Sequence, residues 1–268
     1  MQSNPERKLN EGPAKEFPLK KIVLSLVILI AGSQLFAFET SMLNLKVPSN
    51  LDGKSLLFEL QHRFKGVLTE EPIENFFGLD LGANVSLGLR YAIVPRLELN
   101  AAYTTHEGEY RVGASYAHHI PQIFLMVQAD VQYFNFERNG ERNGNLFYST
   151  AVQSYPIANS FSPVINFAYD SYDEKFGLGI GLQVGFDWWF GPIERISLIG
   201  EYYPVLDEEE TITGPENYFA AGLRVDTDGH RFMLQIGNGW NTGPRRLMLG
   251  TTSNDIYIGF NIQRLLRF

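Results

Sequence analysis

Alternation of apolar and polar residues is the main pattern along this chain. In FGLGIGLQVGFDWWF, residues 176–190, large apolar side chains occupy every even position up to Trp188, and mostly glycine occupies the odd positions between them. Successive side chains of a strand point to opposite faces, so the pattern predicts a strand between an apolar and a polar environment. The glycines leave space on the polar face, which predicts that bulky residues from other strands reach across into it.

Comparable alternation recurs along most of the chain. The stretches that carry it are residues 54–64, 82–94, 96–105, 109–118, 122–134, 145–154, 163–170, 176–190, 195–204, 217–225, 230–238 and 256–268. Connections after odd-numbered stretches are mostly the longer ones, including FERNGERNGN after the fifth, and those after even-numbered stretches are mostly tight. Short turns at one end and longer loops at the other are typical of outer-membrane barrels.

These stretches predict an all-β fold, a single antiparallel transmembrane β-barrel of the outer-membrane type with about twelve strands. In such a barrel the side chains at the apolar alternate positions, the apolar parity, face lipid, and those at the polar positions between them, the polar parity, face the lumen. The alternative is a soluble sandwich, in which the apolar parity would face a protein core. Many glycines on the wet face of a sandwich would weaken its strands, so the pattern favours the barrel.

The N-terminal region resembles an export signal. Lys20 and Lys21 precede an apolar stretch that fades into small residues and reaches Ala37. A positive region, an apolar region and a small residue predict secretion with cleavage after Ala37. The predicted divisions are a leader and signal peptide at residues 1–37, a periplasmic N-terminal segment at 38–53 and the barrel at 54–268. A signal anchor that stays uncleaved is the alternative.

Composition removes several function classes. The 268 residues include no cysteine, which excludes disulfides, thiolate metal sites, a cysteine nucleophile and a lipidated N-terminal cysteine. Loss of residues 1–37 takes away five basic and three acidic residues, so the net charge changes from −8 to −10. An acidic chain of this kind is not expected to bind nucleic acid. Hydrolase, nucleotide-binding and zinc motifs are missing, so we predict no cofactor, no metal and no enzymatic activity.

Four stretches carry a resemblance to a known family. FELQHRF, FFGLDLGANVSLGLRYAI, GHRFMLQIGNGWNTG and DIYIGFNIQRLLRF are similar to domain-of-unknown-function family 5777, bacterial outer-membrane β-barrel proteins without an assigned activity. The resemblance covers most of the chain after the signal and is thinnest around residues 136–175. It implies a barrel in the bacterial outer membrane, and it supplies no catalytic residues.

The C-terminal strand resembles the signal by which outer-membrane barrels are recognised for insertion. It alternates and ends on an aromatic residue, and the residues that carry the likeness are Phe260, Ile262, Leu266 and Phe268. The partners implied are outer-membrane lipid and, during insertion, the barrel-assembly machinery. A periplasmic or surface protein is a further possible partner.

Charged residues on the polar parity are the candidates for lining the lumen. They are Glu59, Arg63, Arg90, Glu98, Arg111, Asp130, Asp187, Glu201 and Arg231. Such charges can line a water-filled passage or pair across the lumen and close it, and about twelve strands fit either state. We predict a channel or transport-related protein that passes small solutes or ions. The alternatives are a plugged structural barrel that anchors a partner and a lipid-active enzyme using His62 at the rim.

Overall fold

The computed structural model describes residues 41–49, 51–154, 161–188, 191–206 and 216–268, so the predicted leader and signal peptide at 1–37 lies outside the described residues. Most of the described chain is strand, and there is almost no helix in it. The strands are β1 (Ser55–Phe64), β2 (Ala83–Val94), β3 (Leu97–Thr104), β4 (Glu109–Ile120), β5 (Leu125–Arg138), β6 (Glu141–Ser154), β7 (Phe161–Asp170), β8 (Lys175–Asp187), β9 (Ile193–Tyr203), β10 (Tyr218–Thr227), β11 (His230–Gly237) and β12 (Tyr257–Arg267).

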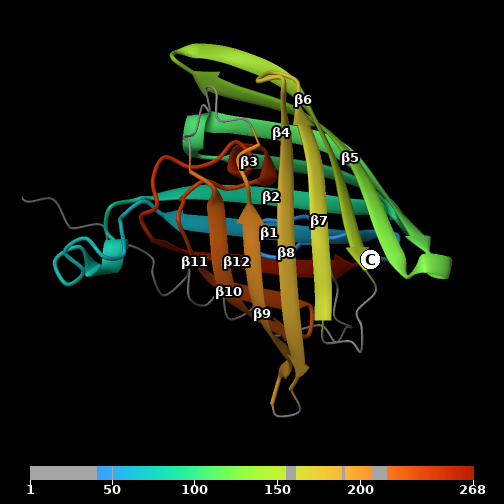
Figure 1. Ribbon diagram of the computed structural model, residues 1–268. Coiled ribbons are helices and arrows are strands. Elements are labelled where there is room, and N and C mark those ends of the chain that lie inside the picture. The colour runs from blue at the N-terminus through green and yellow to red at the C-terminus, as the bar shows by residue number, and fades with distance from the viewer. Residues whose placement is uncertain (1–40, 50, 155–160, 189–190, 207–215) are drawn as a thin grey trace, which may run out of the picture. The chain divides into compact units, whose positions relative to one another are not determined.

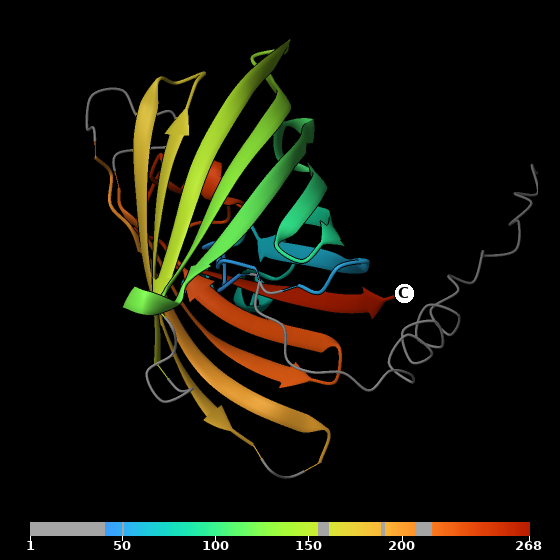
Figure 2. The same cartoon turned by 90° about the vertical axis from the view of Figure 1, so that its right-hand side faces the viewer.

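The strands form one closed antiparallel barrel (Figure 1). Each strand pairs with its neighbour in sequence, and β1 closes the ring against β12 in a register that runs from Ser55 opposite Arg267 to Arg63 opposite Gly259. Closure leaves no unpaired sheet edge, which a membrane-spanning sheet requires. Figure 2 shows the ring from the side. The prediction of a twelve-stranded antiparallel barrel is confirmed.

Apolar side chains lie on the outside of the barrel. On β2, Leu87 and Leu89 are 45% and 47% exposed, whereas Ser86 and Arg90 on the other parity are buried in the interior. The same division holds on β8, where Phe176 and Ile180 are exposed. A soluble sandwich would bury the apolar parity, so the structure excludes that alternative for this sheet. The apolar outside is the surface that lipid covers.

The connection between β5 and β6 differs from the prediction. A longer loop was expected at FERNGERNGN, but both strands continue to a two-residue turn at Asn139 and Gly140. Their φ angles are 54° and 79°, a geometry that Asn-Gly adopts readily and that matches the twist of a hairpin. Turn chemistry therefore outweighs the high polarity of the stretch. The hairpin extends past neighbouring strands in Figure 1.

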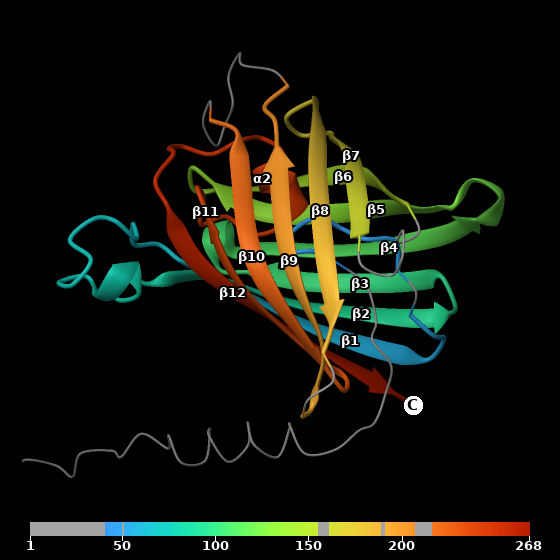
Figure 3. The same cartoon turned by 60° about the horizontal axis from the view of Figure 1, so that its bottom comes forward.

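Two segments that are not part of the wall lie inside the barrel. The N-terminal plug is residues 41–49, and the loop plug is residues 238–251 of the connection between β11 and β12, including the short helix α2 (Pro244–Leu247). Figure 3 shows α2 within the ring of strands. Three short 3-10 turns, η1 (Phe76–Gly78), η2 (His106–Gly108) and η3 (Pro121–Ile123), complete the described elements. Within the described ranges, no helix is both long and apolar enough to span a membrane.

Candidate functional site: an occluded lumen

The structure places eight of the nine predicted lumen residues in the interior. Six are buried and two, Glu59 and Arg111, are half-buried beside a cavity; the buried ones are Arg63, Arg90, Glu98, Asp130, Glu201 and Arg231. Asp187 differs, because it has the inward parity but stands at the last position of β8, beyond the packed interior. Its side chain is 83% exposed and lies 3.7 Å from Arg195. It belongs to the rim and does not line the occluded interior.

The N-terminal plug is bound through a carboxylate of the wall. Glu201 on β9 accepts hydrogen bonds from the backbone N–H groups of Asn44 and Leu45, at 2.8 and 3.0 Å, and from the Asn44 side chain at 3.1 Å. Two further wall residues complete the contact. Arg63 donates to Asn44 Oδ1 at 2.8 Å, and the side-chain amide of Asn261 donates to the Leu43 carbonyl at 2.6 Å. Donors and acceptors that would otherwise be buried unpaired are thereby satisfied.

Glycines of the wall receive the apolar side chains of the same plug. A Cβ on Gly179 or Gly181 would lie 2.5 Å from a Leu45 methyl carbon, and a Cβ on Gly222 would lie 2.7 Å from a Leu43 methyl carbon. A side chain at any of these positions would displace the leucine side chains from the space that they occupy. Bulky residues fill the space over the glycines of β8, as predicted. They come from other strands only in part, because residues of the two plugs lie over Gly177, Gly179 and Gly181.

The described part of the segment predicted as periplasmic, residues 38–53, therefore includes nine residues that lie within the barrel. Two contacts position its second half. The Lys46 ammonium lies 2.6 Å from the Asp130 carboxylate on β5, and the backbone N–H of Ser49 donates to Gln128 at 2.7 Å. An extended segment with so many partners on the wall is part of the folded interior.

The loop plug is held by two buried arginines of α2. Arg245 lies 2.6 Å from the Asp170 carboxylate at the end of β7 and 3.6 Å from that of Glu109 on β4. Arg246 pairs with Glu107 of η2 and lies 3.3 Å from Glu109. Both guanidinium groups are almost fully buried, so each depends on these carboxylates to offset its desolvation.

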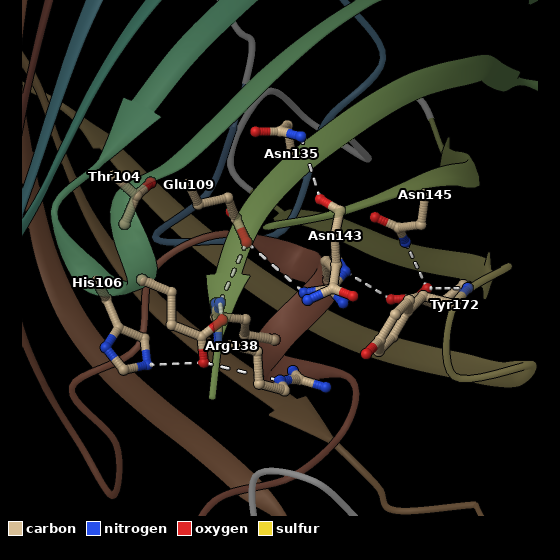
Figure 4. A network of polar contacts seen from close by, with 12 residues as sticks. Thr104, His106, Glu109, Asn135, Arg138, Asn143, Asn145 and Tyr172 are labelled. Atoms are coloured by element: carbon tan, nitrogen blue, oxygen red, sulfur yellow. Dashed lines mark hydrogen bonds and ion pairs between the residues drawn. The ribbon is translucent and has the colours of Figure 1, made fainter. Parts of the chain in front are cut away.

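Neighbouring groups extend this ionic cluster toward the barrel mouth. His106 and Arg138 flank the Glu107 carboxylate at 3.9 Å each, and Figure 4 shows both side chains pointing into the network. The His106 ring also meets Trp240 of the loop plug edge-on, with 4.7 Å between ring centroids. The loop plug therefore contacts the rim through charge and through one aromatic pair.

Burial and charge shift the protonation of this cluster. Burial and the Arg246 guanidinium lower the pKa of His106 to about 4, so the imidazole is neutral at pH 7. Burial raises the pKa of Glu107, but the hydrogen bond and charge of Arg246 outweigh it and keep that pKa below its usual value. Burial and the adjacent Asp170 carboxylate raise the pKa of Asp173.

Between the two plugs the polar side of the lumen retains a cavity of about 50 Å³. Wall residues from β1 to β5 line it together with Ser41, Asn44 and Lys46 of the N-terminal plug and Gly243 and Pro244 of the loop plug. The opposite side of the lumen is filled by an apolar cluster that includes Met42, Leu45 and Met248. The described interior thus has a polar half that contains a cavity and an apolar half packed with buried side chains.

Sequence reasoning did not identify the residues that occlude the lumen. Asn44, Leu45, Arg245 and Arg246 lie in segments without alternation, and a pair of arginines in a loop is ordinary. The glycine row on β8 was the one available signal, because it predicted an occupant without naming it. His62 is the residue predicted to act at the rim if the protein were a lipid-active enzyme. It lies on the outward face of β1 and stacks on Phe260 with 4.8 Å between ring centroids.

A family model described as a membrane bound beta barrel domain, DUF5777, matches residues 38–122 and 154–266. The chain belongs to this family. The resemblance noted in the sequence is therefore confirmed. The match omits residues 123–153, which overlap only part of the stretch expected to be thinnest, residues 136–175. A closed antiparallel barrel with an apolar outside, in a family of membrane-bound barrels, is a protein of the bacterial outer membrane.

Several solved barrels are similar in architecture. LpxR from Salmonella typhimurium has 11% identity and a TM-score of 0.44, with 80% of this chain and 100% of that chain covered. The NanC porin has 10% identity and a TM-score of 0.45, with 80% and 99% covered. Omp33 of Acinetobacter baumannii has 11% identity and a TM-score of 0.41, with 81% and 100% covered. Curated proteins yield no match.

Proposed function

We propose that this outer-membrane barrel is a gated channel for small polar or charged solutes, closed in this structure by its two plugs, and that the loop plug is the part that opens. The wall residues that face the lumen are mostly polar or charged, as a hydrated passage requires. We propose no catalytic role. The partners are outer-membrane lipid and, during insertion, the assembly machinery.

The observation that carries the proposal is the way the loop plug is held. Its charged anchoring contacts are ion pairs from Arg245 and Arg246 to carboxylates on four different wall or rim elements, and they lie beside the buried side chains of Leu247 and Met248. Ion pairs of this kind have two discrete states, paired and hydrated, so they suit a segment that closes and opens. The lumen behind the loop plug already contains the polar cavity.

A plugged structural barrel is the second candidate, and the glycine sockets favour it. Leu43 and Leu45 fit positions where the wall has no side chain, which is the packing of a permanent core. If the loop plug behaves in the same way, the barrel conducts nothing and serves to anchor a periplasmic or surface partner. The two candidates predict different conductance once the arginines of α2 are removed.

Planar-bilayer conductance of the refolded, signal-free protein separates them. We expect the wild type to be closed most of the time. The double variant Arg245→Met, Arg246→Met should open about tenfold more often or better, because each ~1.4 kcal/mol lost from the closed state is tenfold in population. Arg142→Met removes an exposed arginine near the same mouth and should match the wild type. A double variant that is folded, has a released loop plug and stays silent would establish the plugged barrel instead.

A further inference from the structure

Arg111 is exceptional among the cations around the polar cavity. Lys46 is paired with Asp130 at 2.6 Å, and Arg90 is paired with Glu98 at 2.7 Å. Arg111 Nη1, by contrast, is buried with no hydrogen-bond partner among the described residues. A buried guanidinium nitrogen without an acceptor is costly, so a site of this kind is suited to an anion from solution.

The remaining carboxylate of the cavity does not neutralise Arg111 at contact distance. Glu59 accepts a hydrogen bond from the Gln263 side chain at 2.7 Å and forms no ion pair with Arg111 within 4.0 Å. Of the four charged residues lining the cavity, three are cations. Since Lys46 and Arg90 are already paired, Arg111 is the cation of the cavity that has no carboxylate at contact distance among the described residues.

The position of Arg111 connects the cavity to the loop plug. A Cβ on Gly243 would lie 2.7 Å from Arg111 Nη1, and Gly243 has a φ of 84°, a conformation that favours glycine. The guanidinium thus lies directly against the start of α2. An anion bound there would touch the wall and the loop plug together.

Two more unpaired atoms define the rest of the ligand. The side-chain oxygens of Gln61 and Gln132 are buried without hydrogen-bond donors among the residues that the structure describes, and both residues line the cavity. A ligand that satisfies all three atoms needs an oxyanion for Arg111 and a donor, such as a hydroxyl group, for the glutamines. The cavity, of about 50 Å³, has room for only a small ligand.

We propose that this cavity is a binding site for small organic acids that carry a hydroxyl group, with Arg111 as the residue that binds the carboxylate. As a statement of which solutes the channel passes, this rests on the proposed function. As a binding site it does not, because the cavity and its unpaired atoms are present in the closed barrel.

Equilibrium binding in detergent tests the site without any transport. Glycolate is the probe, with acetate and ethylene glycol as analogues that lack the hydroxyl group and the charge. We expect glycolate to bind more tightly than acetate and ethylene glycol not to bind. Arg111→Met should weaken glycolate binding about tenfold or more, because a charge-assisted hydrogen bond is lost. Arg142→Met should bind as the wild type does.

The variants also separate binding from folding. Arg111→Lys keeps the charge without the fork of donors, so it should retain weaker glycolate binding even if Arg111→Met fails to fold. Glycolate affinity unchanged in Arg111→Lys and Arg111→Met would overturn the site, and equal affinity for acetate would overturn the role of the glutamines. If the protein binds glycolate but the bilayer shows no conductance, the channel is ruled out and the binding site is retained. If the Arg245→Met, Arg246→Met variant conducts but glycolate does not bind, the binding site is ruled out and the channel is retained.

Discussion

The N-terminal plug and the loop plug fill the same lumen but are held by different interactions. Leu43 and Leu45 of the N-terminal plug pack where wall glycines leave space, and Glu201 accepts its backbone N–H groups. The loop plug also places Leu247 and Met248 in the apolar cluster, but its polar contacts are ion pairs from Arg245 and Arg246 to carboxylates. Apolar packing of this kind is insensitive to pH and is lost only when the fit is lost, whereas ion pairs depend on protonation.

This difference suggests that the two plugs have different roles, one permanent and one movable. A segment seated in glycine sockets behaves as core, so the N-terminal plug is expected to stay in place under conditions that release the loop plug. The absence of cysteine from the natural sequence makes the comparison measurable. A Leu249→Cys variant reports on the loop plug and a Val47→Cys variant on the N-terminal plug, since both residues are buried and a thiol reacts only when exposed.

The largest effect is expected from Arg245→Met. The change leaves the Asp170 carboxylate without its ion pair and removes one of the two arginines beside Glu109, which costs about 3–5 kcal/mol for a broken buried pair. Thiol labelling should accelerate strongly at Leu249→Cys and stay slow at Val47→Cys. Equal acceleration at both positions would show that the two plugs are one cooperative unit and would end the comparison.

A smaller effect, at the N-terminal plug instead of the loop plug, is expected from Gly181→Val. The new side chain occupies the space of Leu45 and Met42, and overpacking of this kind costs about 1–3 kcal/mol. Thiol labelling should accelerate at Val47→Cys. The temperature above which the folded barrel no longer runs as a separate band on a gel should fall. Gly200→Val is the matched control, because a Cβ there meets nothing within 4 Å. A similar loss of stability in both variants would mean that the contact with Leu45 and Met42 is not responsible.

The smallest effect is expected from pH. The pKa of His106 is about 4 in the closed barrel against an ordinary value of 6.5, so a released loop takes up a proton that the closed one does not. The stabilisation is complete above pH 6.5 and is lost as the pH falls toward 4. Glu107 acts in the same direction at lower pH, whereas Asp173, whose pKa is raised, opposes both.

Labelling of Leu249→Cys should therefore increase modestly from pH 7 to pH 4, after correction with an exposed thiol at Thr252→Cys. The Val47→Cys thiol should show no such trend. His106→Gln should remove the part of the dependence between pH 6.5 and 4. If that variant reproduces the wild-type curve, another group controls the response and His106 has no part in it.

The barrel and the inward faces could be predicted from the chain, because both depend on a local period of two. Glu201, Arg63 and Arg231 were assigned to the lumen by parity, and the structure places them there. Parity does not record where a strand ends, so Asp187 was assigned to the lumen although it stands at the rim. The loop expected between β5 and β6 was wrong for a related reason, since Asn139 and Gly140 make a tight turn within a polar stretch.

Alternation by itself determined the barrel, its strand count and its apolar outside. Only the tertiary structure decided that the lumen is closed, because each closing contact joins residues far apart in the chain: Asn44 meets Glu201 across 157 positions, and Arg246 meets Glu107 across 139. The glycines of β8 show that side-chain volume is missing there. Which side chain fills that volume depends on how the closed ring brings Leu45 and Met248 against them, and no local pattern contains that information.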